Sequence, residues 1–185
     1  MMLTHKGTQR IETERLILRR FTMEDAQAMY DNWASDVDVT RYLTWPAHSD
    51  IGVSRWVLTD WIGSYDKPDY YQWAIELKEL GQPIDSISVV DHRDDVGKSA
   101  IGYCMGKAWW HRGIMPEALK AVIDYLMDEI GFQRVEAVHA PENPNSGAVM
   151  RKAGMTYEGT LRRSGRNNQG ICDECYYSIL SEDRK

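Results

Sequence analysis

The spacing of hydrophobic and polar residues changes several times along the chain, and each change predicts a new element. Strand-like runs occur at 15–21, 70–79, 83–91, 99–106, 134–140, 156–163 and 173–180. Helical spacing occurs at 23–35, near 51–64, in a long segment ending at Gly131, and near 146–153. This order indicates a mixed α/β arrangement around one sheet. No linker or repeat divides it, so we expect residues 1–185 to form a single domain.

The long helix has the clearest pattern. Its apolar stripe consists of Ala118, Leu119, Val122, Ile123, Leu126 and Ile130. Pro116 suits its first turn and Gly131 its C-terminal end. At the start of the chain, Thr22 is placed to cap the helix at 23–35. Residues 36–50, broken by Pro46, are predicted to form a loop.

A strand and a glycine turn lead directly into the long helix, in the sequence IGYCMGKAWWHRGIMPEA. Such a junction leaves unpaired backbone N–H groups and a positive dipole end, which suit an anion such as a pyrophosphate. Any strand–turn–helix unit shares this property, so the junction by itself is a weak indication. The residues GKS at 97–99 resemble the end of a Walker A loop, but His92 replaces its leading glycine, and no G-x-G-x-x-G occurs.

Composition limits the classes of function. The chain has 185 residues, 43% of them hydrophobic, which is enough for one sizeable core. Acidic residues outnumber basic ones 28 to 22, which argues against nucleic acid as a partner. No apolar run approaches the ~18 residues of a membrane span, and the N-terminus is polar, so we expect no membrane partner. Three cysteines suit a reducing compartment, and we expect a cytoplasmic protein.

Residues 101–163 carry a family resemblance. A strand is followed by W-W-x-x-G-I-M-x-E-A, the long helix, a second strand, P-E-N-x-x-S, a short helix, K-A-G-M and Y-E-G-T-L-R. This order resembles the acetyl-CoA-binding half of GNAT N-acetyltransferases, in the RimJ/RimL branch that includes ribosomal-protein N-terminal acetyltransferases. The resemblance implies an α/β (α+β) fold: one mixed, mostly antiparallel twisted sheet of about six to seven strands, splayed after the fourth, with helices on both faces.

The resemblance also implies where acetyl-CoA binds. The family's pyrophosphate loop falls on Trp110, His111, Arg112, Gly113, Ile114 and Met115. Only its central glycine, Gly113, matches, at the point where the backbone approaches the ligand. Arg112 adds a phosphate contact or is a solvated surface arginine, and Trp109 and Trp110 are also interpreted as packing residues.

Strand-edge groups and a second loop complete the expected cofactor site. Tyr103, Cys104 and Met105 would face the pantetheine arm, and one of their amides could polarise the thioester carbonyl. Asn143 would bond the pantetheine. Lys152 either reaches the 3′-phosphate of CoA or only decorates the last helical turn.

Ser146 is the predicted catalytic residue. In the family context it would donate a proton to the departing thiolate. Its structural alternative is a helix N-cap, with Asn145 competing for that position. The two roles can coexist.

The general base cannot be assigned from the sequence. The family's glutamate falls at about Gly165, where no carboxylate exists. The remaining candidates are Glu76, Glu136, His139, Glu158, Asp173 and Glu174. An α-amine with a pKa near ~7.7–8 is already partly neutral at pH 7, so an N-terminal acceptor tolerates this loss better than a lysine.

Other features have simpler explanations. Cys172 and Cys175 form one C-x-x-C, which lacks the second ligand pair of a zinc site. The tryptophans at 33, 56, 61 and 73 are interpreted as mostly core, whereas Trp45 borders the acceptor cleft. Trp45 and Asp173 are assigned to the acceptor.

We therefore expect an acetyl-CoA-dependent N-acetyltransferase that needs no metal and acts by direct attack of a primary amine, a protein N-terminus being favoured. The alternatives are a small amine acceptor, such as a polyamine or antibiotic, or a weakly catalytic acyl-CoA-binding module. Seven tryptophans and the family resemblance also suggest a homodimer.

Overall fold

The structure, a computed structural model, describes residues 3–184. Its strands are β1 (Ile11–Glu12), β2 (Leu16–Arg19), β3 (Gln72–Leu77), β4 (Gln82–Arg93), β5 (Lys98–Met105), β6 (Arg134–His139), β7 (Thr156–Asn167) and β8 (Gly170–Leu180). Its α-helices are α1 (Ala26–Met29), α2 (Val37–Thr40), α3 (Ile51–Ser64), α4 (Ile114–Tyr125) and α5 (Pro144–Lys152). Short 3₁₀ or π segments extend α1 (Met23–Asp25 and Tyr30–Ala34) and α4 (Leu126–Ile130), and another, Lys107–Trp109, lies between β5 and α4.

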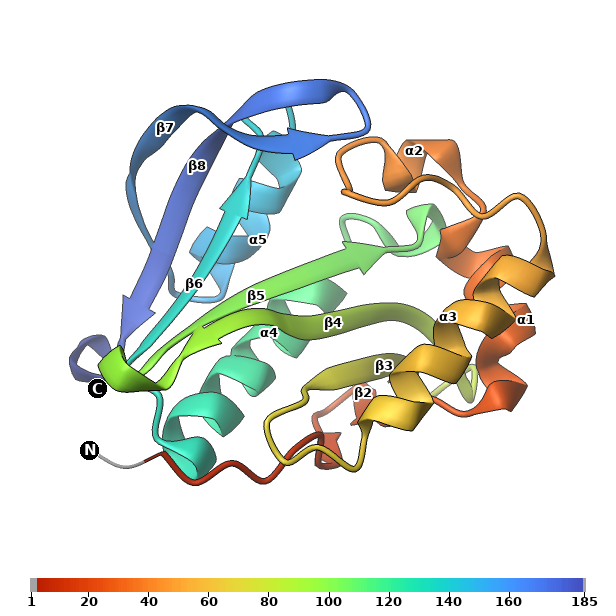
Figure 1. Ribbon diagram of the computed structural model, residues 1–185, viewed down its shortest axis with the longest axis horizontal. Helices are drawn as coiled ribbons and strands as arrows, with labels where there is room; N and C mark the ends of the chain where they lie inside the picture. Colours follow the sequence, from red (N-terminus) through yellow and green to blue (C-terminus); the bar gives the residue numbers. More distant parts are fainter. Residues whose placement is uncertain (1–2, 185) are drawn as a thin grey trace.

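The strands form one sheet in the order β1-β2-β3-β4-β5-β6-β8-β7 (Figure 1). Every neighbouring pair is antiparallel except β5 and β6, which are parallel. Their pairing covers only Lys98–Ala100 against Arg134–Glu136, at the beginning of both strands. Beyond this point β5 and β6 diverge, so the sheet opens between them and leaves an edge of β5 without a strand partner.

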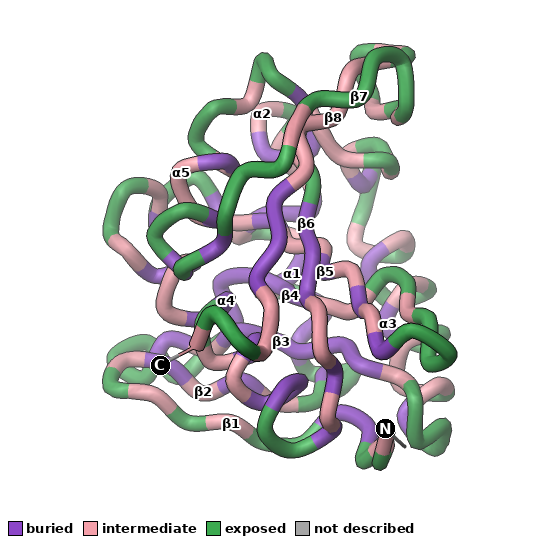
Figure 2. The backbone as a smooth tube through the Cα atoms, turned by 90° about the vertical axis from the view of Figure 1, so that its left-hand side faces the viewer, coloured by how far each residue is buried: buried purple, intermediate pink, exposed green. Residues whose placement is uncertain are grey.

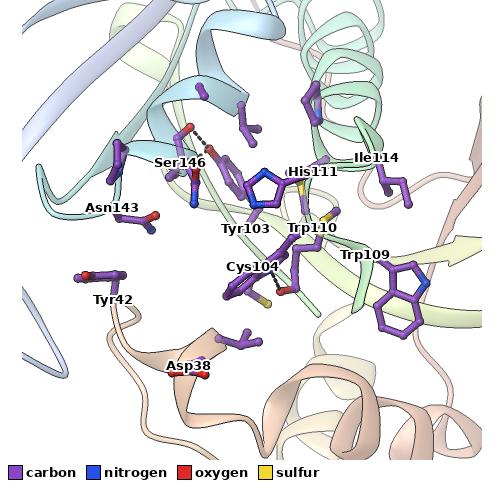
Figure 3. Close-up of a pocket in the computed structure, with 18 of the residues that line it drawn as sticks. Asp38, Tyr42, Tyr103, Cys104, Trp109, Trp110, His111, Ile114, Asn143 and Ser146 are labelled. Carbon is purple, nitrogen blue, oxygen red and sulfur yellow. Dashed lines mark hydrogen bonds between the residues drawn. The ribbon is translucent and has the colours of Figure 1, made fainter. Parts of the chain in front are cut away.

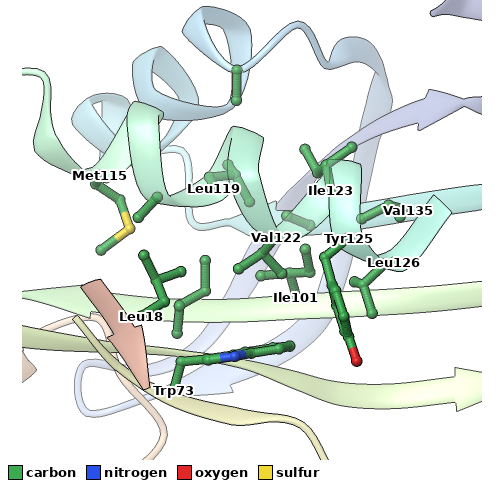
Figure 4. Packing of buried hydrophobic residues seen from close by; sticks show 14 of the residues in the cluster. Leu18, Trp73, Ile101, Met115, Leu119, Val122, Ile123, Tyr125, Leu126 and Val135 are labelled. Carbon is green, nitrogen blue, oxygen red and sulfur yellow. The ribbon is translucent and has the colours of Figure 1, made fainter. Parts of the chain in front are cut away.

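Helices cover both faces of the sheet. On one face, α4 and α5 pack on a core that includes Leu18, Trp73, Ile101 and Val135 (Figure 4). On the other face, α1 and α3 enclose a smaller apolar cluster around Trp33. The central strands are largely buried, whereas the far end of the β7–β8 hairpin is exposed (Figure 2). The predicted fold class is therefore confirmed.

Helix α4 forms as its apolar spacing predicts. The stripe residues Ala118, Leu119, Val122, Ile123, Leu126 and Ile130 are all buried. Gly113 precedes the helix with φ +72°, and Gly131 ends the following π-helical turn with φ +98°. Left-handed backbone of this kind costs glycine least, which explains why the helical segment starts and stops at these two residues.

Several local expectations need correction. The sheet has eight strands instead of six or seven because the two-residue β1 pairs with β2. The predicted loop at 36–50 contains α2, whose N-cap Asp36 accepts a hydrogen bond from the Asp38 N–H at 2.7 Å. Trp33 and Trp73 are fully buried as expected, but Trp56 is 73% exposed. Helical spacing located the inner face of α3 incorrectly, because Ser54 and Leu58 are its buried residues.

Candidate active site

A cavity of about 500 Å³ lies where β5 and β6 part (Figure 3). One wall is the end of β5 with the loop that leads into α4, a second is the start of α5, and a third is α2 with the residues just after it. The splay is the physical cause, because side chains and helix ends, in place of a paired strand, border the open edge of β5. This is the position at which the sequence predicted acetyl-CoA.

Most predicted site residues meet at this cavity. Those that line it are Tyr103, Cys104, Met105, Trp110, His111, Gly113, Ile114, Met115, Asn143, Ser146 and Lys152. They come from two separate regions of the chain: β5 with the loop and first turn of α4 that follow it, and α5 with the residue that precedes it.

The loop entering α4 presents backbone donors. His111 has φ +62° and Gly113 has φ +72°, so the chain turns twice into left-handed conformation just before the helix. No side chain caps the N-terminus of α4. Arg15 holds the loop from behind: its Nε donates to Glu117 at 2.7 Å and its Nη1 to the Arg112 carbonyl at 2.9 Å. The helix end therefore keeps free N–H groups and a positive dipole end.

Ser146 projects from α5 towards Tyr103 on β5. The Tyr103 hydroxyl lies 2.9 Å from Ser146 Oγ and 3.0 Å from the Ser146 carbonyl oxygen. Burial raises the pKa of Tyr103, so its hydroxyl stays a donor throughout the neutral range. Helix α5 begins at Pro144 with Asn143 as its N-cap, so the interpretation of Ser146 or Asn145 as the N-cap is wrong. The preference of Ser and Asn for the N-cap gave the wrong residue because Pro144 suits the first helical position, so the helix starts two residues earlier than the predicted 146.

Cys104 lies at the floor of the cavity and is 8% exposed. Its Sγ is 3.4 Å from Ser86 Oγ. Burial and then the neighbouring Asp85 carboxyl raise the pKa of the Cys104 thiol well above its usual value. A thiol kept protonated is a poor nucleophile, which disfavours an acyl-cysteine intermediate.

The Met105 carbonyl accepts a hydrogen bond from the Trp110 indole at 2.7 Å. This bond ties the loop back onto the end of β5. The bond occupies the Met105 carbonyl, one of the strand-edge groups that the sequence predicted to face the pantetheine arm.

The family model described as "Acetyltransferase (GNAT) domain" matches residues 15–156. The chain belongs to the GNAT acetyltransferase family. Over 173 residues it is 28% identical to the uncharacterized N-acetyltransferase p20 of Bacillus licheniformis, covering 92% of this chain and 96% of that protein.

Solved structures agree with this GNAT assignment. The crystal structure of a GNAT-family acetyltransferase from Bacillus anthracis superposes with a TM-score of 0.83 at 26% identity, covering 94% of this chain and 99% of that one. RimL, a ribosomal L7/L12 alpha-N-protein acetyltransferase solved with coenzyme A, gives a TM-score of 0.82 at 18% identity, with 93% and 98% covered. The latter likeness shows the fold alone.

Three predicted site residues of this GNAT chain lie outside the cavity lining: Arg112, Trp45 and Asp173. Arg112, which is part of the loop entering α4, is exposed to solvent. The Trp45 ring packs on His48, with ring centroids 5.4 Å apart. The Asp173 carboxylate accepts the Arg163 N–H at 2.8 Å within the β7–β8 hairpin. Local interactions hold the last two away from the cavity, and sequence proximity could not reveal this.

Within residues 3–184, the cavity lining includes none of the six candidates for the general base. Glu76 binds Arg19 at 2.6 Å, Glu136 binds Lys98 at 2.7 Å, and Glu158 binds Arg134 at 2.6 Å. The Arg134 guanidinium lowers the pKa of Glu158 to about 2. Each of these three carboxylates is held in an ion pair away from the cavity, so these residues have structural roles.

Sequence reasoning missed the residues of the third wall, Asp38, Arg41 and Tyr42, and the acidic Glu142 beside Asn143. The Lys107 ammonium binds the Asp38 carboxylate and lowers the pKa of Asp38. The sequence contained one indication that a helix forms here: Asp36, whose residue type and position are typical of a helix N-cap.

The hairpin between β7 and β8 positions this third wall. Asn168 Nδ2 donates to the carbonyls of Thr40 and Trp45, each at 2.7 Å, and the Asn168 N–H donates to the Leu43 carbonyl at 3.0 Å. The hairpin therefore lies against α2 and the segment after it and holds that segment in place, as Figure 1 shows.

Among residues 3–184, no helix combines the length and the apolar character needed to cross a bilayer.

Proposed function

We propose that this protein transfers the acetyl group of acetyl-CoA to a primary amine, with a protein N-terminal α-amine as the favoured acceptor. The observation that carries the proposal is the convergence of three features on one cavity: the open edge of β5, the uncapped N-terminus of α4, and Ser146 at the start of α5. The structure of RimL with coenzyme A, an acetyltransferase of α-amines with the same fold, supports both parts of the proposal.

The residues present suit acetyl-CoA. The free N–H groups around Ile114 offer an anion site for the pyrophosphate, and Lys152 adds a cation to the cavity lining. Acetyl-CoA supplies an activated thioester, whose C–S bond breaks as the amine forms an amide. No covalent acyl-enzyme is required.

Ser146 serves the leaving group in this proposal. The Tyr103 hydroxyl can donate either to the Ser146 carbonyl or to Ser146 Oγ, which are 3.0 Å and 2.9 Å away. When Tyr103 donates to Oγ, the Ser146 hydrogen is free to point into the cavity. It then stabilises the departing sulfur, whose negative charge grows as the C–S bond breaks.

The cavity lining offers few acidic side chains that could act as a general base, which favours an α-amine. The acids in the lining are Asp38, whose pKa Lys107 lowers, and the exposed Glu142. At pH 7 roughly one α-amine in ten is neutral, whereas only about one lysine in 2,500 is. An acceptor that is already partly neutral needs little help to lose its proton.

The test is a CoA-release assay with matched acceptors. One peptide carries a free N-terminus and one internal lysine, and its control carries the same lysine behind an acetylated N-terminus. We expect release with the first peptide and at least a hundredfold less with the second. Faster turnover of polyamines or aminoglycosides would assign a small-molecule acceptor. Normal acetyl-CoA binding without release from any amine would leave only an acyl-CoA-binding module.

A further inference from the structure

A second cluster of chemically active side chains lies at the opposite end of β4 and β5 from the cavity. It consists of His5, His92 and Asp94, whose nearest ligand atoms all lie within 4.8 Å of one another. His5 Nε2 is 3.1 Å from one oxygen of Asp94, and His92 Nδ1 is 2.8 Å from the other. His92 pairs with Ser99 at the beginning of β5, whereas the cavity borders its end at Tyr103–Met105.

We propose that this cluster binds one divalent transition-metal ion, with Zn²⁺ as the best match, through His5 Nε2, His92 Nδ1 and Asp94. Two imidazole nitrogens with a carboxylate favour zinc, nickel or copper over calcium or magnesium, which prefer oxygen alone. Nitrogen and oxygen ligands about 2.0–2.1 Å from zinc lie about 3.3 Å apart across a tetrahedral edge. The distances to Asp94, 3.1 Å from His5 Nε2 and 2.8 Å from His92 Nδ1, run to different carboxylate oxygens and are somewhat shorter than this value, so a metal ion would replace these two hydrogen bonds with a small outward shift of its ligands.

The far nitrogen of each histidine provides independent support. His5 Nδ1 lies 2.7 Å from the Tyr71 hydroxyl, and His92 Nε2 lies 3.9 Å from the Asp69 carboxylate. Metal-bound histidines usually have such an oxygen partner on their second nitrogen, which orients the ring and fixes the tautomer. The His5 ring has this arrangement, and the Asp69 carboxylate lies on the corresponding side of the His92 ring, beyond hydrogen-bond distance.

Packing and charge also suit an ion. The Phe132 ring, which is fully buried, meets both imidazoles edge-on at centroid distances of 5.9 and 6.2 Å. The His5 side chain is 14% exposed while that of Asp94 is 54% exposed, so an ion can enter from the Asp94 side. The carboxylates of Asp94 and Asp69 balance two positive charges. Water can supply the fourth ligand.

A metal here would join distant parts of the chain. His5 belongs to the N-terminal segment, His92 to β4, and Asp94 to the turn before β5. Binding to the folded state alone stabilises it by mass action. At free zinc 100 times the Kd we expect the melting temperature to rise by roughly 5–10 °C.

The experiment titrates the full-length protein, stripped with EDTA and dialysed, with ZnSO₄ by calorimetry and thermal melting. We expect one zinc per chain and the stated shift. His5→Ala/His92→Ala should lose both, Asp94→Asn should bind at least tenfold more weakly, and Tyr71→Phe should bind about 10–100-fold more weakly because its outer partner is gone. The last two substitutions preserve shape, so they keep the test valid if the double variant does not fold.

The matched control is Cys172→Ser/Cys175→Ser, which removes the other sequence pair that can bind zinc. This variant should keep the stoichiometry and affinity of the parent. Loss of zinc by the cysteine variant, unchanged affinity in the double-histidine variant, or no zinc bound by the parent would each overturn the proposal.

Discussion

The Tyr103 hydroxyl lies 2.9 Å from Ser146 Oγ, so a strand and a helix are joined across the point where the sheet opens. The contact unites a residue from β5 with one from α5, 43 positions later in the chain. It also places the predicted catalytic hydroxyl at the wall of the cavity.

Replacing Ser146 with alanine should reduce kcat by about 10²–10⁴-fold, the range of general acid catalysis. Acetyl-CoA affinity should change little, because the interaction strengthens only as the thiolate forms. Since Ser146 is not the N-cap of α5, the melting temperature should fall only by the worth of one hydrogen bond. Ser178→Ala, which loses a bond to Glu158 at 2.6 Å, is the control. Turnover within about threefold of the parent would remove Ser146 from the mechanism.

Replacing Tyr103 with phenylalanine should reduce kcat about three- to tenfold, because a hydrogen bond of about 1 kcal/mol no longer orients Ser146. Steady-state kinetics on both single variants and the double variant tests the coupling. On the Ser146→Ala background the same change should add almost nothing. Multiplicative effects in the double variant would show that Tyr103 acts independently of Ser146.

Replacing Gly113 with alanine should raise KM for acetyl-CoA while changing kcat little. The residue has φ +72°, so alanine costs about 1–2 kcal/mol of strain, although its Cβ would meet only Arg15 Nη2 at 3.7 Å. Gly81→Ala is a matched control with φ +63° and no atom within 4 Å. Both variants should lose similar stability in urea unfolding, and an equal KM change in both would contradict a special role of Gly113.

Replacing Asp85 with asparagine should stabilise the protein increasingly as pH rises. Asp85 is fully buried, its Oδ2 has no hydrogen-bond partner, and burial raises its pKa well above the usual value. A raised folded-state pKa contributes stability at low pH that is lost as pH rises through it. Above about pH 4 the free energy of unfolding of the variant should therefore rise relative to that of the parent, by at most about 1.4 kcal/mol per pH unit. Urea unfolding at pH 5, 7 and 9 measures this, and a constant difference would refute it.

We expect a homodimer in solution, and Trp56 is the first residue to test. Its side chain is 73% exposed on α3, an unusual position for a large aromatic residue. Light scattering should give twice the monomer mass, and Trp56→Ser should weaken the dimer if α3 lies in the interface. Changes at exposed positions usually alter stability by no more than about 0.5 kcal/mol, so the variant should stay folded. A monomer mass at every accessible concentration would exclude the dimer.

Local sequence determined most elements of the fold. The stripe from Ala118 to Ile130 predicted α4 because residues three and four apart share one face of a helix. The glycine turn before it predicted the anion site, since the helix end and its free N–H groups are purely local features. The order of motifs also identified the residues from β5, α4 and α5 that meet at the cavity.

Tertiary structure decided what depends on contacts between distant segments. Only the folded chain shows that the base candidates Glu76, Glu136 and Glu158 are paired with cations away from the cavity. Asp38 enters the cavity wall because Asn168 of the β7–β8 hairpin holds the segment after α2. These contacts join residues 24 to 128 positions apart, and the approach of His92 to His5 likewise joins distant parts of the chain. Hydrophobic periodicity reports which face of an element is buried, and it carries no information about which distant polar groups that burial brings together.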